Sequence, residues 1–339
     1  MPGKIAVIGS GSWGTAASGL LSPHVDEVCI WAHSPRVAES INSDHRNPRQ
    51  LKEYVLPGNV SASHDFARVL DGAESMVLAA PSSFLRGICE ELAPSVPADL
   101  PIVVLTKGIE PKTHLLMADV AADVLGEPER VAALSGPNHA EEISRGMLSA
   151  AVVAGSREDV VSYFQQAFVS QAFRVYRSDD LVGVEVCAAV KNVVAIACGV
   201  SAGLGLGDNA LAVLMTRGLA EISRIANAMG GRPLTCMGLA GMGDLVATCT
   251  SRHSRNRTFG EAYAKGTTLE EYESATGMVV EGARAALSTW ELAHERGIEA
   301  PLTDAVHAIL YEGRKLDDVI GLLLDRDPHV EFYGLDGVE

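Results

Sequence analysis

The sequence predicts an α/β fold, with a doubly wound parallel sheet in the first half of the chain and an all-helical domain in the second half. In the first half, short apolar runs of β-type residues alternate with segments of helical length, a pattern typical of parallel strands covered by helices. After about residue 178 this strand pattern stops. The length of 339 residues corresponds to about two domains of roughly 150 residues. We therefore expect an N-terminal domain at residues 1–178 and a C-terminal domain at residues 179–339.

The expected elements follow in a regular order. Strands are expected at residues 4–8, 27–31, 75–80, 101–105, 131–134, 150–154 and 173–176. Helices are expected at residues 181–200, 209–229, 279–296 and 302–312. Asp208-Asn209 and Thr303-Asp304 have the residue types that begin helices. Gly230-Gly231 and Gly297 have the residue type that ends helices. The acidic tail Asp325–Glu339 is expected to be loosely ordered.

Charge and hydropathy exclude several classes of partner. Lys and Arg number 27 against 43 Asp and Glu, which gives a net charge of −16, whereas proteins that bind nucleic acid or anionic lipid present a positive face. No apolar run is expected to reach the roughly 18 residues that a membrane span needs. The first residues lack the form of a signal peptide. We therefore expect a cytoplasmic protein that binds no nucleic acid and does not insert into a membrane.

The cysteines are not spaced as metal ligands or as a disulfide framework. No C-x-x-C pair occurs, and most cysteines lie among apolar residues. We expect reduced thiols in the core at Cys29, Cys89, Cys187, Cys198, Cys236 and Cys249. No bound metal ion is predicted.

A glycine loop follows the first expected strand. Residues 9–14 match G-x-G-x-x-G and lead directly into a small-residue helix, which is the context in which this motif is informative. Gly9 allows the tight turn, Gly11 lets the backbone approach a pyrophosphate, and Gly14 lets helix and strand pack closely. The helix N-terminus then offers N–H groups to the phosphates. The first domain is therefore predicted to be a Rossmann-type dinucleotide-binding domain.

The end of the second expected strand bears on the choice of dinucleotide. Many NAD-selective sites hold the ribose 2′-hydroxyl with an Asp or Glu at this position, but residues 31–36 contain no carboxylate. His33 and Arg36 are suited to a 2′-phosphate instead. NADP(H) is therefore favoured over NAD(H). If these two residues are simply solvated, NAD(H) remains the alternative.

Lys191 lies in a segment, residues 186–197, that is apolar at almost every other position. Burial lowers the pKa of a lysine and prepares it to exchange a proton near neutral pH. The alternatives are a side chain that extends from the helix edge to solvent and a structural ion pair. We expect Lys191 to be catalytic.

Lys107 follows the strand expected at residues 101–105. Ligands of open α/β sheets gather at the carboxyl ends of the strands, so its ammonium group is expected to face the cofactor crevice. A surface lysine at a strand end is the alternative.

A basic segment follows Asp244 in this otherwise acidic chain. Three arginines, Arg252, Arg255 and Arg257, lie close together, and Ser254 has the residue type of a helix N-cap. Arginine side chains and helix-end N–H groups are expected to converge on one anion, for which a substrate phosphate fits best. A solvated basic turn is the alternative.

Together these motifs resemble those of the bacterial NAD(P)-dependent glycerol-3-phosphate dehydrogenases over nearly the whole chain. The glycine loop is shared by many families, whereas the segment around Lys191 and the block from Asp244 to Arg257 are more particular. The segments that carry the resemblance are residues 9–16, 106–110, 135–137, 189–192, 216–221, 241–245, 254–257 and 279–282.

The resemblance implies reversible hydride transfer between dihydroxyacetone phosphate and sn-glycerol 3-phosphate, which would supply phospholipid synthesis. Lys191, Lys107 and Asp244 form the expected catalytic set. The expected substrate-binding residues are Lys107, Gly136, Asn138, Lys191, Asp244, Ser254, Arg255 and Asn256. The expected cofactor-binding residues, with the glycine loop and Arg36 included, are Gly9, Gly11, Ser12, Trp13, Gly14, His33, Arg36, Lys107, Ala140, Arg255, Val279 and Glu281. A homodimer is expected because enzymes commonly pair.

These roles agree with the chemistry of ketone reduction. Hydride addition creates an alkoxide, so the site needs a positive, proton-bearing group beside that oxygen. Lys191 meets this need, and Asp244 can orient it or the substrate hydroxyl. Arg255 would bind the phosphate away from the reacting carbon and so position that carbon, while the nicotinamide carries the redox chemistry.

The chain departs from the family pattern at one place. Many relatives read Ser-Gly-Pro-Thr-Phe-Ala where this chain has Ser-Gly-Pro-Asn-His-Ala at residues 135–140. Asn138 can still donate and accept hydrogen bonds. His139 is expected to replace the phenylalanine in the pocket wall, outside the catalytic set.

Two other functions are compatible with part of the pattern. A dehydrogenase for a hydroxy acid or hydroxyacyl thioester explains the glycine loop and a catalytic lysine, but not the basic block beside Asp244. A non-catalytic dinucleotide sensor needs no lysine in an apolar helix, and a DNA-binding version needs a basic face that this chain does not readily provide.

Overall fold

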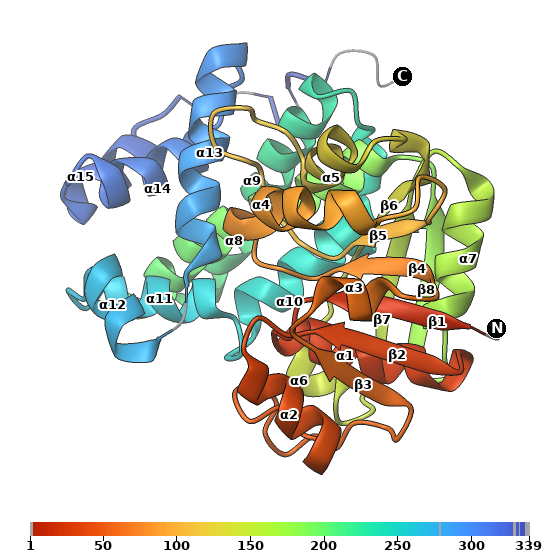
Figure 1. Cartoon of the computed structure of the whole chain (residues 1–339). Helices are drawn as coiled ribbons and strands as arrows, with labels where there is room; N and C mark the ends of the chain where they lie inside the picture. Colours follow the sequence, from red (N-terminus) through yellow and green to blue (C-terminus); the bar gives the residue numbers. More distant parts are fainter. Residues whose placement is uncertain (1–2, 278, 328–329, 332, 336–339) are drawn as a thin grey trace. The chain divides into compact units, whose positions relative to one another are not determined.

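The computed structural model describes residues 3–277, 279–327, 330–331 and 333–335. Two compact units make up the chain (Figure 1): unit 1 comprises Met1–Lys107 and Leu115–Leu181, and unit 2 comprises Gly108–His114 and Val182–Glu339. The chain enters unit 2 for the second time after Leu181, slightly later than the domain boundary expected after residue 178. Sequence patterns also gave no sign that Gly108–His114 belongs to unit 2, where His114 Nδ1 lies 2.8 Å from Glu295 Oε2.

Unit 1 is built on an eight-stranded sheet with the strand order β3-β2-β1-β4-β5-β6-β7-β8. The strands are β1(Lys4–Ile8), β2(Glu27–Trp31), β3(Val60–Ser63), β4(Ala73–Leu78), β5(Ile102–Val104), β6(Val131–Ser135), β7(Ser149–Ala154) and β8(Phe173–Ser178). The chain runs outward from β1 to β3 and then returns to β4 on the other side of β1, which is the order of a doubly wound sheet. The predicted fold class is confirmed.

Two details of the sheet differ from expectation. β7 runs antiparallel to β6, because their connection contains only the short helix α6(Ala140–Ile143) rather than the long crossover that a parallel pair needs. The edge strand β3 has the sequence VSAS, which contains no apolar run and so gave no strand signal.

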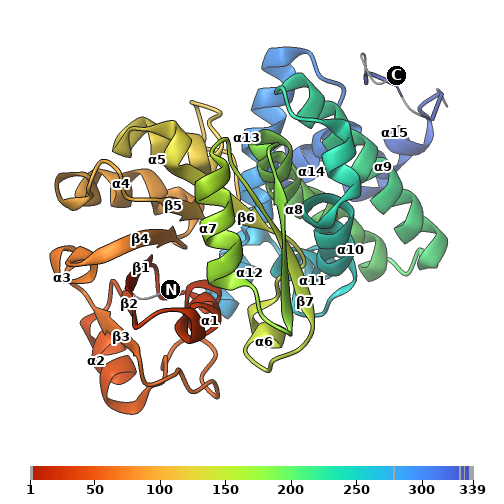
Figure 2. The ribbon, with the colours of Figure 1, turned by 90° about the vertical axis from the view of Figure 1, so that its right-hand side faces the viewer.

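Both faces of the sheet are buried under helices. In β1, Ile5 and Val7 belong to one core cluster, while Ala6 and Ile8 belong to another, as expected where successive side chains point to opposite faces. The first cluster packs against α1(Ser12–Leu21), α2(Pro35–Asp44) and α7(Glu158–Phe168). The second packs against α3(Phe66–Leu70), α4(Ser82–Leu92) and α5(Met117–Leu125), of which α4 and α5 lie side by side (Figure 2).

Helices make up most of unit 2. They are α8(Leu181–Gly203), α9(Gly207–Ala228), α10(Asp244–Thr250), α11(Arg255–Tyr263), α12(Leu269–Thr276), α13(Glu281–Arg296), α14(Pro301–Tyr311) and α15(Leu316–Leu324). α8 is buried along most of its length, and Val193 and Ile196 on it pack against Phe259 of α11 and Val306 of α14. The predicted helical domain is confirmed, and α8 is its central element.

α8 corrects the expectation about membrane-spanning length. It has 23 residues and is long and apolar enough to cross a membrane by length and composition. However, 83% of its most apolar window is buried inside the protein, which is what a core helix requires. All six cysteines are free and buried, which confirms the expectation of core thiols.

The ends of the helices follow the predictions in part. α13 ends at Gly297, with a left-handed φ of 64°, and α9 ends just before Gly230. The predicted helix starts were wrong: α9 begins at Gly207, and α14 begins at Pro301. Pro301 has the residue type favoured at a first helical position. The caps therefore lie upstream of the residues that the sequence indicated.

Part of the tail Asp325–Glu339, for which loose order was expected, lies outside the described residues: 328, 329, 332 and 336–339. The described residues of the tail contact unit 2. Arg326 forms an ion pair with Glu299, and the Glu331 carbonyl oxygen accepts a hydrogen bond from Arg217 Nη1 at 2.9 Å.

Candidate active site

The glycine loop joins β1 to α1 where the strand order of the sheet reverses, the position at which doubly wound sheets bind ligands. A Cβ atom on Gly14 would lie 2.0 Å from the Gly9 carbonyl oxygen, so only glycine permits this approach. A Cβ atom on Gly11 would meet none of the other described residues within 4 Å, its chain neighbours apart. No side chain caps the N-terminus of α1. The loop therefore has open space and helix-end N–H groups suited to a pyrophosphate.

The other loop residues predicted to contact a cofactor differ in their surroundings. Trp13 packs on the core of unit 1, with its ring centroid 6.4 Å from that of Phe173. Ser12 Oγ donates a hydrogen bond of 2.7 Å to Gln50 Oε1. His33 and Arg36 are exposed beyond the carboxyl end of β2, and no carboxylate occupies residues 31–36. An exposed cation at this edge is available to a phosphate.

Phe84 is a further candidate, absent from the residues predicted from the sequence. It lies in the first turn of α4, directly after the carboxyl end of β4, and is 60% exposed. Large apolar side chains are usually buried, and β4 is the neighbour of β1 at the reversal of strand order. An aromatic residue just beyond a strand end was the signal available in the sequence. Phe84 is suited to pack against the flat rings of a dinucleotide.

Lys107 and Gly136 follow the paired strands β5 and β6, and Lys107 Nζ lies 3.5 Å from the Gly136 carbonyl oxygen. Asn138 Nδ2 donates to the Ala150 carbonyl oxygen at 3.0 Å. Its Oδ1 atom is buried and has no hydrogen-bond partner among the described residues. An unused buried acceptor costs free energy unless a ligand satisfies it. The structure therefore brings three predicted substrate residues to one edge of the sheet. Ala140 begins α6 next to them.

Lys191 lies in the interior of unit 2 and is 5% exposed. Its ammonium group is ion-paired with Asp244 Oδ1 and donates a hydrogen bond of 2.7 Å to Thr248 Oγ1. Asp244 and Thr248 are 3% and 4% exposed, so all three side chains are shielded from water. A buried charge requires such a partner. The expectation that Lys191 is buried is confirmed, and the ion pair considered as an alternative is present as well.

The local sequence explains how Asp244 reaches Lys191. A wide helical turn, η5(Leu239–Gly243), precedes α10 and places Asp244 at its first residue. Thr248 follows one turn later on the same face of the helix, where its hydroxyl donates to Asp244 Oδ1 at 3.3 Å. Thr248 was not among the residues predicted from the sequence, although its spacing of four residues from a candidate catalytic aspartate was a usable signal.

A thiol pair lies near this group. A hydrogen bond with Cys198 of α8, together with burial, raises the pKa of the Cys249 thiol well above its ordinary value. Cys249 therefore stays neutral near pH 7 and adds no charge beside Lys191 and Asp244.

The basic block begins α11. Ser254 is its N-cap, and the Arg257 N–H donates to Ser254 Oγ at 3.2 Å, which confirms the predicted cap. The Nη2 atom of Arg257 forms an ion pair of 2.6 Å with Glu261 one turn later in the same helix, so part of this guanidinium is already engaged. Arg255 is exposed at the first helical position. The block thus presents two exposed arginines, Arg252 before the cap and Arg255 after it.

Asn256 joins three elements of unit 2. Its Nδ2 atom donates to Asn192 Oδ1 on α8, and its Oδ1 atom accepts the N–H of Gly282 at the start of α13; both distances are 2.9 Å. Asn192 is the neighbour of Lys191, so this amide ties the basic block to the lysine helix. Glu281 is the first residue of α13. Val279 precedes that helix and is half-buried.

Comparison with known proteins decides the family. The family described as NAD-dependent glycerol-3-phosphate dehydrogenase matches with its N-terminal part at residues 4–161 and with its C-terminal part at residues 180–321. The chain belongs to this family. The resemblance drawn from the motifs is thereby confirmed.

The similarity extends over nearly the whole of each relative. The chain is 47% identical over 330 residues to a glycerol-3-phosphate dehydrogenase (NAD(P)+) of Nocardia farcinica, covering 95% of this chain and 98% of that protein. It is 42% identical to one of Clostridium perfringens, covering 97% and 99%. A crystal structure of glycerol-3-phosphate dehydrogenase from Coxiella burnetii has a TM-score of 0.91 at 36% identity, covering 96% of this chain and 99% of that one.

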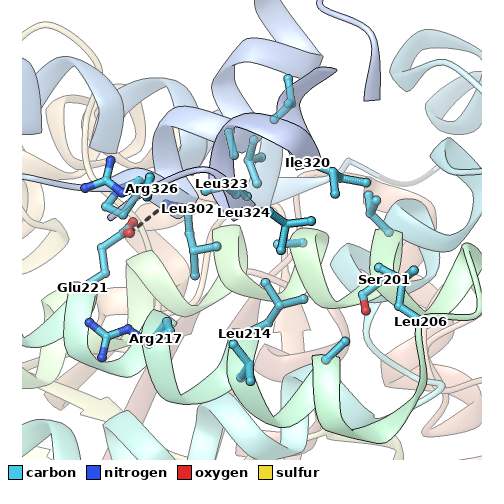
Figure 3. Close-up of a pocket in the computed structure, with 18 of the residues that line it drawn as sticks. Ser201, Leu206, Leu214, Arg217, Glu221, Leu302, Ile320, Leu323, Leu324 and Arg326 are labelled. Atoms are coloured by element: carbon cyan, nitrogen blue, oxygen red, sulfur yellow. Dashed lines mark hydrogen bonds between the residues drawn. The ribbon is translucent and has the colours of Figure 1, made fainter. Parts of the chain in front are cut away.

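A separate apolar groove of about 750 Å³ lies within unit 2. Helices α8, α9, α14 and α15 line it, together with described residues of the tail. Figure 3 shows Glu221, Arg217 and Arg326 at one end of the groove and Leu206 at the other. The groove contains none of the predicted catalytic residues.

Proposed function

We propose that this member of the family catalyses the NAD(P)H-dependent, reversible reduction of dihydroxyacetone phosphate to sn-glycerol 3-phosphate and so supplies phospholipid synthesis. The observation that carries the proposal is the buried contact of Lys191 with Asp244 and Thr248. It combines a proton-bearing cation with two groups that orient it, in a chain whose relatives are named for this reaction.

The chemistry assigned to the lysine follows from its surroundings. When bound, the reduced nicotinamide supplies the hydride. The Lys191 ammonium group stabilises the negative charge that develops on the carbonyl oxygen and donates a proton to it. Asp244 keeps the ammonium group in place, and its negative charge compensates the buried positive charge. In the reverse direction, the neutral amine accepts the proton of the alcohol.

The substrate is held by groups that do not take part in the chemical step. Lys107 and Asn138 bind the polar end of the substrate, and the buried, unused acceptor of Asn138 suits a substrate hydroxyl. Arg255 binds the phosphate, supported by the end of α11 at Ser254. Asn256 has both ends of its amide engaged within the protein, so we assign it the role of holding the basic block beside the lysine helix.

The dinucleotide is proposed to bind at the glycine loop, through Gly9, Gly11, Ser12, Trp13 and Gly14. The free space beside Gly11 and the uncapped end of α1 support this assignment. The remaining proposed contacts are His33, Arg36, Phe84, Lys107, Ala140, Arg255, Val279 and Glu281. The exposed His33 and Arg36 favour NADP(H) over NAD(H).

The test follows the loss of NADPH and NADH absorbance with dihydroxyacetone phosphate and, separately, with unphosphorylated dihydroxyacetone. Turnover with the phosphate ester alone is expected, with the higher kcat/KM for NADPH. Turnover with both ketones would contradict a phosphate site at Arg255. NADPH binding without any turnover would contradict the proposed substrate and favour a hydroxy acid.

We also propose that the protein is a homodimer that pairs through the groove of unit 2. Exposed large apolar side chains gather around it: Leu204, Leu206, Val213, Leu324 and Val330. Exposed apolar patches of this kind mark interaction sites. Groups of both charges also line the groove, among them Arg217, Asp327 and Glu331. A surface that is apolar and carries both charges can be complementary to itself, as a twofold interface requires.

The oligomeric state tests this assignment. The wild type is expected to have the mass of a dimer by light scattering, and Val213→Asp is expected to yield monomers. Val246→Asp, at an exposed apolar residue outside the groove, is the matched control and is expected to remain dimeric. A monomeric wild type, or a dimer that persists in Val213→Asp, would contradict the proposal.

A cytoplasmic location is part of the proposal. Its support is the set of six free, buried cysteines, which is the usage of proteins in reducing compartments.

A further inference from the structure

Asn47 is buried beneath the glycine loop, on the connection between α2 and β3, and is 1% exposed. Its Nδ2 atom donates to the Ser10 carbonyl oxygen at 2.8 Å and to Thr15 Oγ1 at 2.9 Å. Its Oδ1 atom accepts the N–H groups of Arg49 and Gln50 at 3.0 and 3.1 Å. The amide therefore uses its full hydrogen-bonding capacity of two donors and two acceptor sites.

The partners of Asn47 fix the orientation of its amide. Backbone N–H groups can only donate, so the atom facing Arg49 and Gln50 is the oxygen. A backbone carbonyl can only accept, so the atom facing Ser10 is the nitrogen. Aspartate has the same shape but no donor, and it would set a negative oxygen against the Ser10 carbonyl.

The two groups that receive the Asn47 donors lie at opposite ends of the glycine loop. Ser10 comes before Gly11, where the loop is open to a ligand, and Thr15 is a buried residue in the first turn of α1. Glycine-rich backbone has many accessible conformations, and ordering it upon binding costs free energy. A single amide that holds both ends keeps the loop in the conformation that presents the N–H groups of α1.

The connection that carries Asn47 is itself anchored. The Leu56 N–H donates to the His45 carbonyl oxygen at 2.8 Å, so the ends of the segment 45–56 meet. Gln50 accepts the hydroxyl of Ser12 at 2.7 Å, which adds a second tie to the glycine loop. The segment therefore supports the loop at Ser10, Ser12 and Thr15.

We infer that Asn47 is a positioning residue for the dinucleotide: it holds the glycine loop ready for the pyrophosphate without touching the ligand. The inference rests on the part of the proposed function that assigns dinucleotide binding to this loop. It predicts that Asn47 affects cofactor affinity much more than the chemical step.

The experiment measures the NADPH dissociation constant of the purified full-length protein by fluorescence titration, together with kcat at saturating NADPH. Asn47→Asp is expected to raise the dissociation constant at least about tenfold, as expected when two hydrogen bonds are lost. It is expected to change kcat by less than about twofold, because the Lys191 group is untouched. Gln50→Ala removes only the tie to Ser12 at an exposed position and is expected to raise the constant about two- to threefold.

Asn59→Asp is the matched control. Asn59 likewise donates two hydrogen bonds through its Nδ2 atom within unit 1, here to the backbone carbonyls of Ser22 at 2.9 Å and Val25 at 3.1 Å, but neither belongs to the glycine loop. It is expected to lower the melting temperature while leaving the NADPH dissociation constant unchanged. Unchanged NADPH binding in Asn47→Asp, or equal weakening in both variants, would overturn the inference.

The outcomes separate this inference from the proposed function. A wild type that binds NADPH but does not reduce dihydroxyacetone phosphate refutes the proposed reaction, and the comparison of Asn47→Asp with Asn59→Asp still decides the role of Asn47. A wild type that binds neither NADPH nor NADH refutes both. If Asn47→Asp does not fold, Thr15→Val decides, because it removes the acceptor of one Asn47 hydrogen bond: an unchanged dissociation constant in that variant would overturn the inference.

Discussion

The glycine loop of unit 1 and the lysine group of unit 2 are built in opposite ways. The loop is a contiguous stretch of chain, Gly9–Gly14, in which three glycines leave the backbone accessible. The lysine group consists of buried side chains brought together across 53 positions of sequence, from Lys191 to Asp244. Binding a phosphate chain needs access to backbone N–H groups, whereas moving a proton needs a charge held away from water. The first kind of site fails when an atom is added, and the second fails when a charge is removed.

The largest effect is expected from removing the positive charge of Lys191 in unit 2. Lys191→Met keeps much of the side-chain volume but has no proton to give, so kcat should fall about 1,000-fold or more. The NADPH dissociation constant should stay within about twofold, because the glycine loop is unchanged. Steady-state kinetics and a binding titration measure the two quantities. Equal losses of turnover and cofactor binding would show that Lys191 is structural.

The next largest effect is expected from replacing a glycine of unit 1 by alanine, at two positions with different surroundings. Gly14→Ala forces a Cβ atom against the Gly9 carbonyl oxygen, so both the melting temperature and cofactor affinity should fall, the latter on the order of 100-fold. Gly11→Ala meets open space and should weaken NADPH binding while the melting temperature stays unchanged. Thermal unfolding with and without NADPH measures both. If Gly11→Ala binds normally, the pyrophosphate does not approach this residue.

A smaller effect is expected from the exposed arginine of the basic block. Arg255→Ala should raise KM for dihydroxyacetone phosphate about 10- to 100-fold through the loss of a charge-assisted contact with the phosphate. Any weakening of NADPH binding should be much smaller. Arg252→Ala removes another exposed arginine of the same block and should leave KM unchanged. Equal effects of the two variants would mean that only the general positive charge of the block matters.

The smallest expected effect concerns a buried carboxyl group with no part in the chemistry. Glu221 accepts hydrogen bonds from the N–H groups of Leu302 and Thr303 at 2.8 and 2.9 Å, and burial raises its pKa above 4.5. A raised folded-state pKa contributes stability below the unfolded pKa and loses it as pH rises through the folded pKa.

The measurement is urea unfolding of the wild type and Glu221→Gln. The difference in the free energy of unfolding between the wild type and the variant should decrease as pH rises above about 4.5, the ordinary pKa of a glutamate. Kinetic constants at neutral pH should not change. A difference that grows with pH would mean that the hydrogen bonds from α14 outweigh the cost of burial.

Two buried cations show what sequence patterns can and cannot predict. Lys191 was identified because its helix is apolar nearly all round, and burial followed from that pattern. Arg130 is also buried, at 2% exposure, and gave no such signal. Its guanidinium donates to the backbone carbonyls of Leu100, shortly before β5, and Leu125, the last residue of α5. It therefore satisfies backbone acceptors rather than moving a proton. Only the identity of the partners separates the two roles.

The sequence by itself determined the fold class, the glycine loop and the buried lysine, because each depends on local order: the periodicity of apolar residues, a motif of contiguous residues, and one charge in an apolar helix. The tertiary structure decided which groups meet. The pairing of Lys191 with Thr248, the amide of Asn47 beneath Ser10 and the carboxyl of Glu221 at the start of α14 each join residues far apart in the chain. Polar side chains of this kind carry no periodic signal, and a buried hydrogen bond is specified only when folding removes water and leaves one partner within reach.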